Sequence, residues 1–344
     1  MADIVLAIGT SHSPLLLLPS AEWVDRGNDD KKNQKLNLSD GRFVAYDALE
    51  QEVQGRFADR ATTATFADQY SLCQTSLDRL ANELAAAKPD VVLIVGDDQE
   101  ELFDLKSMPA FAIFWGDEIV TRPLESMHYI PSWLAKSPAS AGYAMDMIRR
   151  YPGSPAFGKF AIEQLVNEGI DVAAVSSVQN PGTQGFGHAY GFIIQRLFQG
   201  REIPVLPVLL NTYYPPNRPT PARCYQIGQA IRRMIDAYPE KLRVAVVASG
   251  GLSHFVCDEV LDRRVLKAIS EGDAEDLASL PRTTLNSGSS EIANWICVSG
   301  IMAGHGIKWN QYVPVHRTPA GTGIGLSFLT WASPDPKAFV RREI

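Results

Sequence analysis

The stretch Lys88-Pro89-Asp90-Val91-Val92-Leu93-Ile94-Val95-Gly96-Asp97-Asp98 decides the fold of this chain. Its centre is an unbroken apolar run rich in β-branched side chains, and proline, glycine and aspartate mark its ends. Such a run is typical of a strand that is buried on both faces, as in a parallel sheet. Apolar residues recur at helical spacing over residues 67–87, so we expect a helix to lead into this strand.

The same alternation of strand and helix returns along the chain. We expect helices over residues 160–167 and 222–237, and strands over 4–8, 172–175, 205–210, 244–248 and 325–329. This alternation predicts an α/β sandwich in which helices flank a largely parallel or mixed central sheet. No repeat or linker-like change of composition divides residues 1–344. We therefore expect a single domain, with a polar insertion of loops and short helices over about 19–70.

Composition and charge exclude several classes of protein. The chain is 45% hydrophobic and 21% charged, as in ordinary globular proteins. Its net charge of −7 argues against a nucleic-acid partner, because binding phosphates needs clustered positive charge. We see no apolar run near the roughly 20 residues that span a bilayer and no signal peptide. We therefore expect a cytoplasmic protein that binds a small molecule. The four scattered cysteines do not suggest a disulfide framework.

Three of the six histidines follow strand-like runs or lie in glycine-rich turns. His12 follows the first expected strand and His254 follows the strand over 244–248. Both imidazoles are therefore expected at one edge of the sheet, where open α/β sheets bind ligands. His188 lies among glycines, which let a ligand approach the backbone closely, and is a third candidate for the same cleft. Glu291 begins a predicted helix, where an acidic residue serves either as a functional carboxylate or only as a cap.

Several short motifs occur in order across nearly the whole chain: Ser11-His12-Ser13-Pro14, Asp97-Asp98, Gly187-His188, Asn211-Thr212-Tyr213-Tyr214-Pro215-Pro216, Gly250-Gly251-Leu252-Ser253-His254 and Ser289-Ser290-Glu291. Taken together, they resemble the class III extradiol dioxygenases, which are non-haem Fe(II) enzymes that open catechol-type rings with O2. Within that family the motifs are most similar to those of 3-O-methylgallate dioxygenases.

The resemblance implies a set of roles for these residues. His12 and Glu291 would bind Fe(II), His254 would be the catalytic acid/base, and His188 would be a second polar residue beside the substrate. Gln99 occupies the position of the family's usual second histidine ligand, so an amide is aligned where an imidazole is expected. An oxygen-rich site also admits Mn(II), or no metal. Four residues are candidates for the missing ligand: Gln99, Asp97, Asp98 and His128.

The resemblance also implies the substrate and the assembly. A catecholic benzoate such as 3-O-methylgallate, gallate or protocatechuate would react with O2, in a homodimer or larger homo-oligomer. In protocatechuate enzymes a Ser-Asn pair contacts the substrate carboxylate. Gly321 and Thr322 take those places here, in a segment that equally fits a plain turn. Tyr214 and its aromatic neighbours are expected to line the pocket or to pack in the core.

Two other functions remain open from the sequence. A relative with altered metal ligands would use the same scaffold for hydrolysis or C–C bond cleavage, and Gln99 is the feature that favours this alternative. A non-catalytic binding protein would keep the fold and lose the chemistry. The matches at His12, His188, His254 and Glu291 argue against that second alternative.

Overall fold

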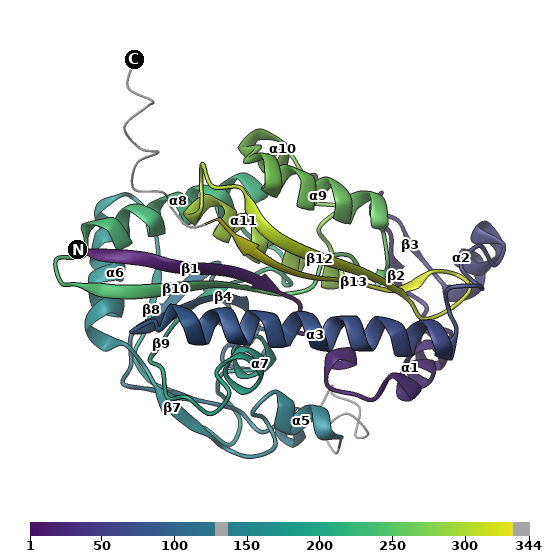
Figure 1. The fold of residues 1–344 in the computed structure, drawn as a ribbon, viewed down its shortest axis with the longest axis horizontal. Helices are drawn as coiled ribbons and strands as arrows, with labels where there is room; N and C mark the ends of the chain where they lie inside the picture. Colours follow the sequence, from purple (N-terminus) through teal and green to yellow (C-terminus); the bar gives the residue numbers. More distant parts are fainter. Residues whose placement is uncertain (128–136, 333–344) are drawn as a thin grey trace.

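Nine strands form one mixed sheet in the computed structural model, which describes residues 1–127 and 137–332 (Figure 1). The strands β1, β10, β4 and β9 are parallel, whereas β13 runs antiparallel to β1 and β5 runs antiparallel to β9. This arrangement confirms the predicted α/β fold. From one edge the path is β11 (His254–Val256), β13 (Thr322–Trp331), β1 (Ala2–Thr10), β10 (Leu242–Ser249), β4 (Val91–Asp97), β9 (Val205–Leu210), β5 (Phe111–Phe114) and β8 (Ala173–Val175), and β12 (Ile307–His316) pairs with β13 outside this path.

The apolar run of β4 is buried on both faces of the sheet. Val91, Leu93 and Val95 pack into one hydrophobic core, whereas Val92 and Ile94 pack into the other. Successive side chains of a strand point to opposite faces, so a strand that is covered on both sides needs an apolar residue at every position. The strand β10 divides its buried side chains between the same two cores.

Helices cover both faces of the sheet (Figure 1). The helices α3 (Thr63–Ala87) and α7 (His188–Leu197) contribute to one core. The opposite core contains side chains of α6 (Pro155–Asn167), α8 (Pro221–Ala237) and α11 (Ile292–Ile301). The other elements are α1 (Trp23–Asp30), α2 (Tyr46–Val53), α5 (Pro138–Gly142), α9 (Glu259–Glu271), α10 (Ala274–Ala278), and the strand pairs β2 (Leu36–Asn37) with β3 (Phe43–Val44) and β6 (Glu118–Val120) with β7 (Arg150–Pro152).

Every strand and helix expected from the sequence is present. The strand predicted over 205–210 coincides with β9, and the others differ from the prediction only at their ends. The polar segment predicted over 19–70 ends earlier, because α3 already begins at Thr63. All four cysteines are buried and free. Within the described ranges, no helix combines the length and the apolar character that crossing a membrane requires.

Polar residues follow the parallel strands at one edge of the sheet. β1 leads into His12, β4 leads into Gln99, and β10 leads through a pair of glycines to His254. Because parallel strands end at the same edge, these three loops meet there, and the sequence predicts this for His12 and His254.

Candidate active site

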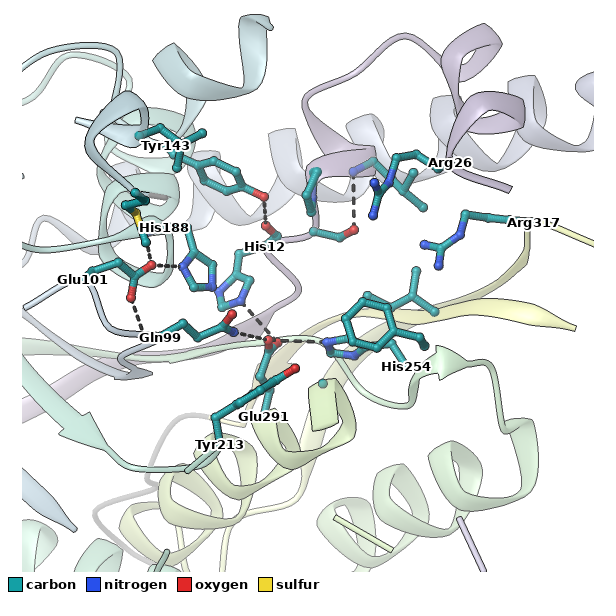
Figure 2. Close-up of a pocket in the computed structure, with 18 residues that line it drawn as sticks. His12, Arg26, Gln99, Glu101, Tyr143, His188, Tyr213, His254, Glu291 and Arg317 are labelled. Carbon is teal, nitrogen blue, oxygen red and sulfur yellow. Dashed lines mark hydrogen bonds and ion pairs between the residues drawn. The ribbon is translucent and has the colours of Figure 1, made fainter. Parts of the chain in front are cut away.

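Four side chains of metal-ligating type meet at this edge. Ligand atoms of His12, Asp97, His188 and Glu291 all lie within 4.8 Å of one another, so the group could hold a metal ion. His12 follows β1, Asp97 ends β4, His188 begins α7, and Glu291 immediately precedes α11. Two of the three metal ligands implied by the resemblance, His12 and Glu291, therefore lie side by side (Figure 2).

Hydrogen bonds fix the tautomer of His12. The Ser249 hydroxyl donates to Ala189 O at 2.6 Å, so its oxygen accepts from His12 Nδ1 at 2.9 Å. In the neutral ring the lone pair is then on His12 Nε2, an atom that has no hydrogen-bond partner among the described residues and lies 3.2 Å from Glu291 Oε2. Two buried, electron-rich atoms that face each other require a cation or a proton between them. Metal-ligating histidines show this same arrangement, with the second ring nitrogen donating to a neighbour.

Glu291 connects the cluster to two further residues. Its Oε2 accepts from Gly251 N at 2.6 Å, and its Oε1 lies 3.4 Å from both His254 Nε2 and Gln99 Nε2. Burial opposes ionisation, but His12 and His254 hold the pKa of Glu291 well below its usual range. The carboxylate is therefore ionised at neutral pH, as a metal ligand must be.

Gln99 turns its amide nitrogen toward the neighbouring carboxylates. Nε2 donates to Asp97 Oδ2 at 3.0 Å and lies near Glu291 Oε1. If the Gln99 amide were flipped, its oxygen would face two carboxylate oxygens, and because an oxygen acceptor cannot donate to them, both contacts would be lost. Burial and then Glu291 raise the pKa of Asp97, because two buried carboxyl groups lie close together. A bound cation would relieve this repulsion, and Asp97 is the carboxylate placed to share it with Glu291.

Asp98, another candidate for the missing ligand, is not part of this cluster. Asp98 accepts hydrogen bonds from Leu102 N at 2.8 Å and Phe103 N at 3.3 Å, so its carboxylate orders the loop after β4. His128 lies outside the described residues.

The Glu101 side chain contacts the His188 ring, and nothing in the sequence indicates this contact. His188 Nδ1 is in hydrogen-bond contact with Glu101 Oε1, and Glu101 Oε2 accepts from Gln99 N at 2.6 Å. Burial disfavours the charged ring, but Glu101 outweighs it and raises the pKa of His188 to about 10. His188 is therefore an imidazolium near neutral pH, which favours donating a hydrogen bond over ligating a metal.

His254 borders the cluster from the first position of β11. Its Nδ1 donates to Leu252 O at 2.9 Å, and its backbone N–H donates to Ser289 Oγ at 2.9 Å. These two bonds fix the ring and direct Nε2 toward Glu291. Burial lowers the pKa of His254, but Glu291 raises it by more, so that it lies above the usual value. A histidine held in this way can accept and return a proton.

One cavity of about 220 Å³ is lined by His12, Gln99, Glu101, His188, His254 and Glu291, whereas Asp97 is not among its lining residues. Figure 2 shows His188 and Glu101 on one side of it and Arg26 and Arg317 on the other. Apolar and aromatic side chains also line the cavity: Leu15, Leu124, Met127, Tyr143, Tyr213, Phe255 and Ile324.

The residues predicted to contact the substrate lie elsewhere. Thr322 is fully buried and donates to Asp30 Oδ2 at 2.8 Å, and neither Thr322 nor Gly321 is among the residues that line the cavity. Of the two adjacent tyrosines expected there, Tyr213 lines the cavity and Tyr214 does not. The turn that contains Gly321 and Thr322 instead supplies Arg317, a residue whose role nothing in the sequence suggests.

Two other aromatic residues lie in packed surroundings. Trp295 is fully buried and donates from Nε1 to Gly250 O at 2.9 Å, so it belongs to the core. His316 stacks on Phe57 with ring centroids 4.1 Å apart and lies outside the cavity lining.

Comparison with known proteins identifies the family. A family model described as the catalytic LigB subunit of aromatic ring-opening dioxygenase matches residues 67–327. Over 41 residues the chain is 61% identical to gallate dioxygenase of Pseudomonas putida, a match that covers 12% of this chain and 12% of that protein. The chain thus matches only a small part of the length of this curated relative. The family model, in contrast, covers most of the chain and includes His188, His254 and Glu291. This chain therefore belongs to the family of catalytic LigB subunits of aromatic ring-opening dioxygenases.

Proposed function

We propose that this protein is an Fe(II)-dependent extradiol dioxygenase that opens the ring of a catecholic benzoate with O2. The observation that carries the proposal is the lone pair of His12 Nε2, which faces the Glu291 carboxylate beside Asp97 at the wall of a largely apolar cavity. The family supplies the reaction class. Substrates of the 3-O-methylgallate, gallate or protocatechuate type fit a cavity that has metal ligands and arginines on its walls.

His12, Asp97 and Glu291 would hold the metal. Compared with a 2-His-1-carboxylate triad, this set exchanges one imidazole for a carboxylate, which suits Fe(II) and also admits Mn(II). When bound, such a metal supplies Lewis acidity that favours ionised catechol hydroxyls, together with the redox chemistry that O2 requires. Gln99, the ligand implied by the resemblance, would instead donate to Asp97 and Glu291 and orient both carboxylates.

His254 would move the proton. Because Nδ1 is committed to Leu252 O, the neutral ring has its lone pair on Nε2, on the side of Glu291. That nitrogen would take a proton from a catechol hydroxyl and later return one to the product. His188, charged through its contact with Glu101, would donate a hydrogen bond to the substrate beside the metal ligands.

The cavity wall would position the ring. Tyr213, Phe255 and Ile324 line the space and present apolar surface to an aromatic substrate. Holding the ring in one orientation removes part of the entropic barrier, and apolar walls exclude water from the reaction.

Oxygen uptake tests the proposal. Protein that is purified anaerobically and loaded with Fe(II) is mixed in turn with 3-O-methylgallate, gallate and protocatechuate, in an oxygen electrode and in a spectrophotometer. We expect O2 to be consumed in proportion to at least one substrate, with the appearance of a ring-opened chromophore. The ranking of the three acids would give the specificity. Folded protein that consumes no O2 with any of them would contradict the proposal.

The glutamine at position 99 favours one competing function, a hydrolase or C–C lyase on the same scaffold. Such an enzyme would convert its substrate without consuming O2, so the same electrode separates the two reactions. A non-catalytic relative would bind neither Fe(II) nor Mn(II), and a metal titration of the purified protein would identify it.

A further inference from the structure

Two arginines reach the cavity from distant parts of the chain. Arg26 belongs to α1, and Arg317 directly follows β12. Figure 2 shows both guanidinium groups on the side of the cavity away from His188 and Glu101. Arg317 is only 7% exposed, and the Arg26 side chain is 20% exposed. Two cations that are largely removed from water beside an apolar cavity indicate a site for an anion.

Buried hydrogen bonds to Asp30 hold the Arg317 guanidinium group in place. Its Nε and Nη2 donate to the two oxygens of Asp30 at 2.7 and 3.1 Å, and Thr322 Oγ1 donates to the same carboxylate at 2.8 Å. All three residues are buried. The pair with Asp30 does not use Nη1, which is left to bind another acceptor. A guanidinium group fixed in this way needs little further ordering to bind a carboxylate.

Arg26 adds a second positive charge. Its Nη1 lies 3.7 Å from Asp29 Oδ2, but Asp29 is 45% exposed, so this ion pair is weak. Burial and then the nearby Arg317 lower the pKa of Arg26, because the two guanidinium groups repel each other. A bound anion between them would relieve that repulsion.

We propose that Arg26 and Arg317 bind the carboxylate of the aromatic substrate and make the enzyme selective for aromatic acids over neutral catechols. This inference rests on the proposed function, in which the diol end of the substrate lies at the metal ligands. The arginines lie across the cavity from His188 and Glu101, and apolar side chains also line this cavity. Arg26 precedes the residues matched by the family model, whereas Arg317 lies within them, so the family match covers only one of the two arginines. Thr322, predicted to contact the carboxylate, would act on it only through Asp30 and Arg317.

The substrate pair gallate and pyrogallol tests the subsite, because the two molecules differ only in the carboxylate. We would measure kcat/KM for both with the Fe(II)-loaded wild type, Arg26→Gln and Arg42→Gln. Arg42 is the matched control, since it lies in the same N-terminal segment but pairs with Asp40 and Glu52 at the surface. We expect the ratio of gallate to pyrogallol to fall about 10- to 100-fold in Arg26→Gln, the loss of a charge-assisted hydrogen bond, and to stay unchanged in Arg42→Gln. An unchanged ratio in Arg26→Gln would overturn the proposal.

Benzoate binding gives a readout that does not depend on turnover. Arg317→Gln alone would leave Asp30 buried without its cation, so the second variant is Asp30→Asn combined with Arg317→Gln. We expect metal-free wild type to bind benzoate in calorimetry, and both Arg26→Gln and the double variant to bind it about 10- to 100-fold more weakly. Equal affinity in all three proteins, or no binding to the wild type, would overturn the subsite.

The two proposals fail in different ways. If the wild type does not consume O2 with gallate but benzoate binding depends on both arginines, the proposed reaction is wrong and the carboxylate subsite stands. If O2 uptake is normal while neither the substrate ratio nor benzoate affinity responds to the variants, the subsite is wrong and the reaction stands.

Discussion

His12 and His254 both donate from Nδ1 to a neighbour and turn Nε2 toward Glu291. Their surroundings give them different tasks. His12 is 3% exposed and its ligand atom lies within 4.8 Å of that of Asp97, so its lone pair is placed for a metal. His254 has a side chain that is 12% exposed and lines the cavity, so its Nε2 can meet a substrate hydroxyl.

Replacing the proposed base tests this division of tasks. We predict that His254→Phe lowers kcat by about 10²- to 10⁴-fold, the usual contribution of general acid–base catalysis, and leaves the fold and the metal content unchanged. Stopped-flow or steady-state turnover, circular dichroism and metal analysis check the three parts. His305→Gln, outside the cavity lining, is the matched histidine control. If His254→Phe kept most of its kcat, another group would be the base.

The third metal ligand can be identified by metal affinity alone. Asp97→Asn keeps the shape of the side chain and removes its charge, so we predict at least about a tenfold loss of affinity for Mn(II). Gln99→Met keeps the length of that side chain and removes both its donor and its acceptor, and we predict a smaller loss. Anaerobic titration followed by electron paramagnetic resonance measures both. The opposite order, with Gln99→Met the weaker binder, would make Gln99 the ligand that the resemblance implies.

Sequence reasoning located His12, His188, His254 and Glu291 because each follows a strand or begins a helix in a short, recognisable motif. Arg317 could not be found in this way, because its importance comes from Asp30, a residue 287 positions away. The direction of the Gln99 amide likewise depends on two carboxylates that meet only in the folded chain.

At the scale of elements, β1 and α11 approach closely because residue 9 is glycine. A Cβ atom on Gly9 would lie 2.3 Å from the buried ring of Trp295. The strand β1 leads to His12, and Glu291 immediately precedes α11. The close contact therefore helps to set the distance between two proposed metal ligands.

Filling this contact should disturb both stability and the site. We predict that Gly9→Ala lowers the free energy of unfolding by about 1–3 kcal/mol, because the Trp295 ring has to move within a packed core. Gly182→Ala is the control: a Cβ there meets no atom within 4 Å, so we predict a change within about 0.5 kcal/mol. Urea unfolding measures both variants. Equal stability of Gly9→Ala and the wild type would show that β1 and α11 have room to separate.

Asp262 joins α9, β11 and β12. Its carboxylate accepts from Ser253 N and Oγ, both at 2.8 Å, and from Tyr312 Oη at 2.7 Å. Burial raises the pKa of Asp262 from 3.8 to about 7. The folded protein therefore holds a proton here over a pH range in which the unfolded chain has released it. The stability that this proton contributes is largest below pH 4 and is lost as the pH rises to 7.

A neutral replacement isolates this effect. The stability of Asp262→Asn does not depend on protonation at this site. The free energy of unfolding of the wild type minus that of Asp262→Asn therefore reports the protonation of Asp262 alone. We predict that this difference falls by about 2–3 kcal/mol between pH 5 and pH 8. It should fall by roughly 1.4 kcal/mol per pH unit until the pH reaches the pKa of Asp262 in the folded protein, and then level off. Urea unfolding at several pH values measures it. A difference that grew with pH would mean that Asp262 is ionised in the fold.

Strands that are buried on both faces are the easiest to predict from sequence. β4 and β9 are fully buried, and their continuous apolar runs reveal them. β12 escaped prediction because it is half-buried, carries Lys308, Asn310 and Gln311, and includes Pro314. Its extended conformation is set by a long antiparallel pairing with β13, which is a tertiary contact.

At the scale of the whole molecule, the site needs the complete sheet. Its proposed metal ligands range from residue 12 to residue 291, and its arginines come from α1 and from the turn between β12 and β13. The cavity has the Glu291 carboxylate and a pair of guanidinium groups on its walls, and apolar side chains also line it. That distribution of charge is what favours a substrate with a diol at one end and a carboxylate at the other. The single domain, the cytoplasmic location and the homo-oligomer expected from the sequence stay predictions.

The oxygen atoms of the product test the proposed reaction most directly. Fe(II)-loaded protein would convert its preferred catecholic acid under ¹⁸O2, and mass spectrometry with NMR would locate the label and the broken bond. We predict a ring opened beside the diol, with both atoms of one O2 molecule incorporated and the label retained in the new carboxylate. A product whose new oxygen comes from water, or a ring broken between the two hydroxyl-bearing carbons, would contradict extradiol cleavage.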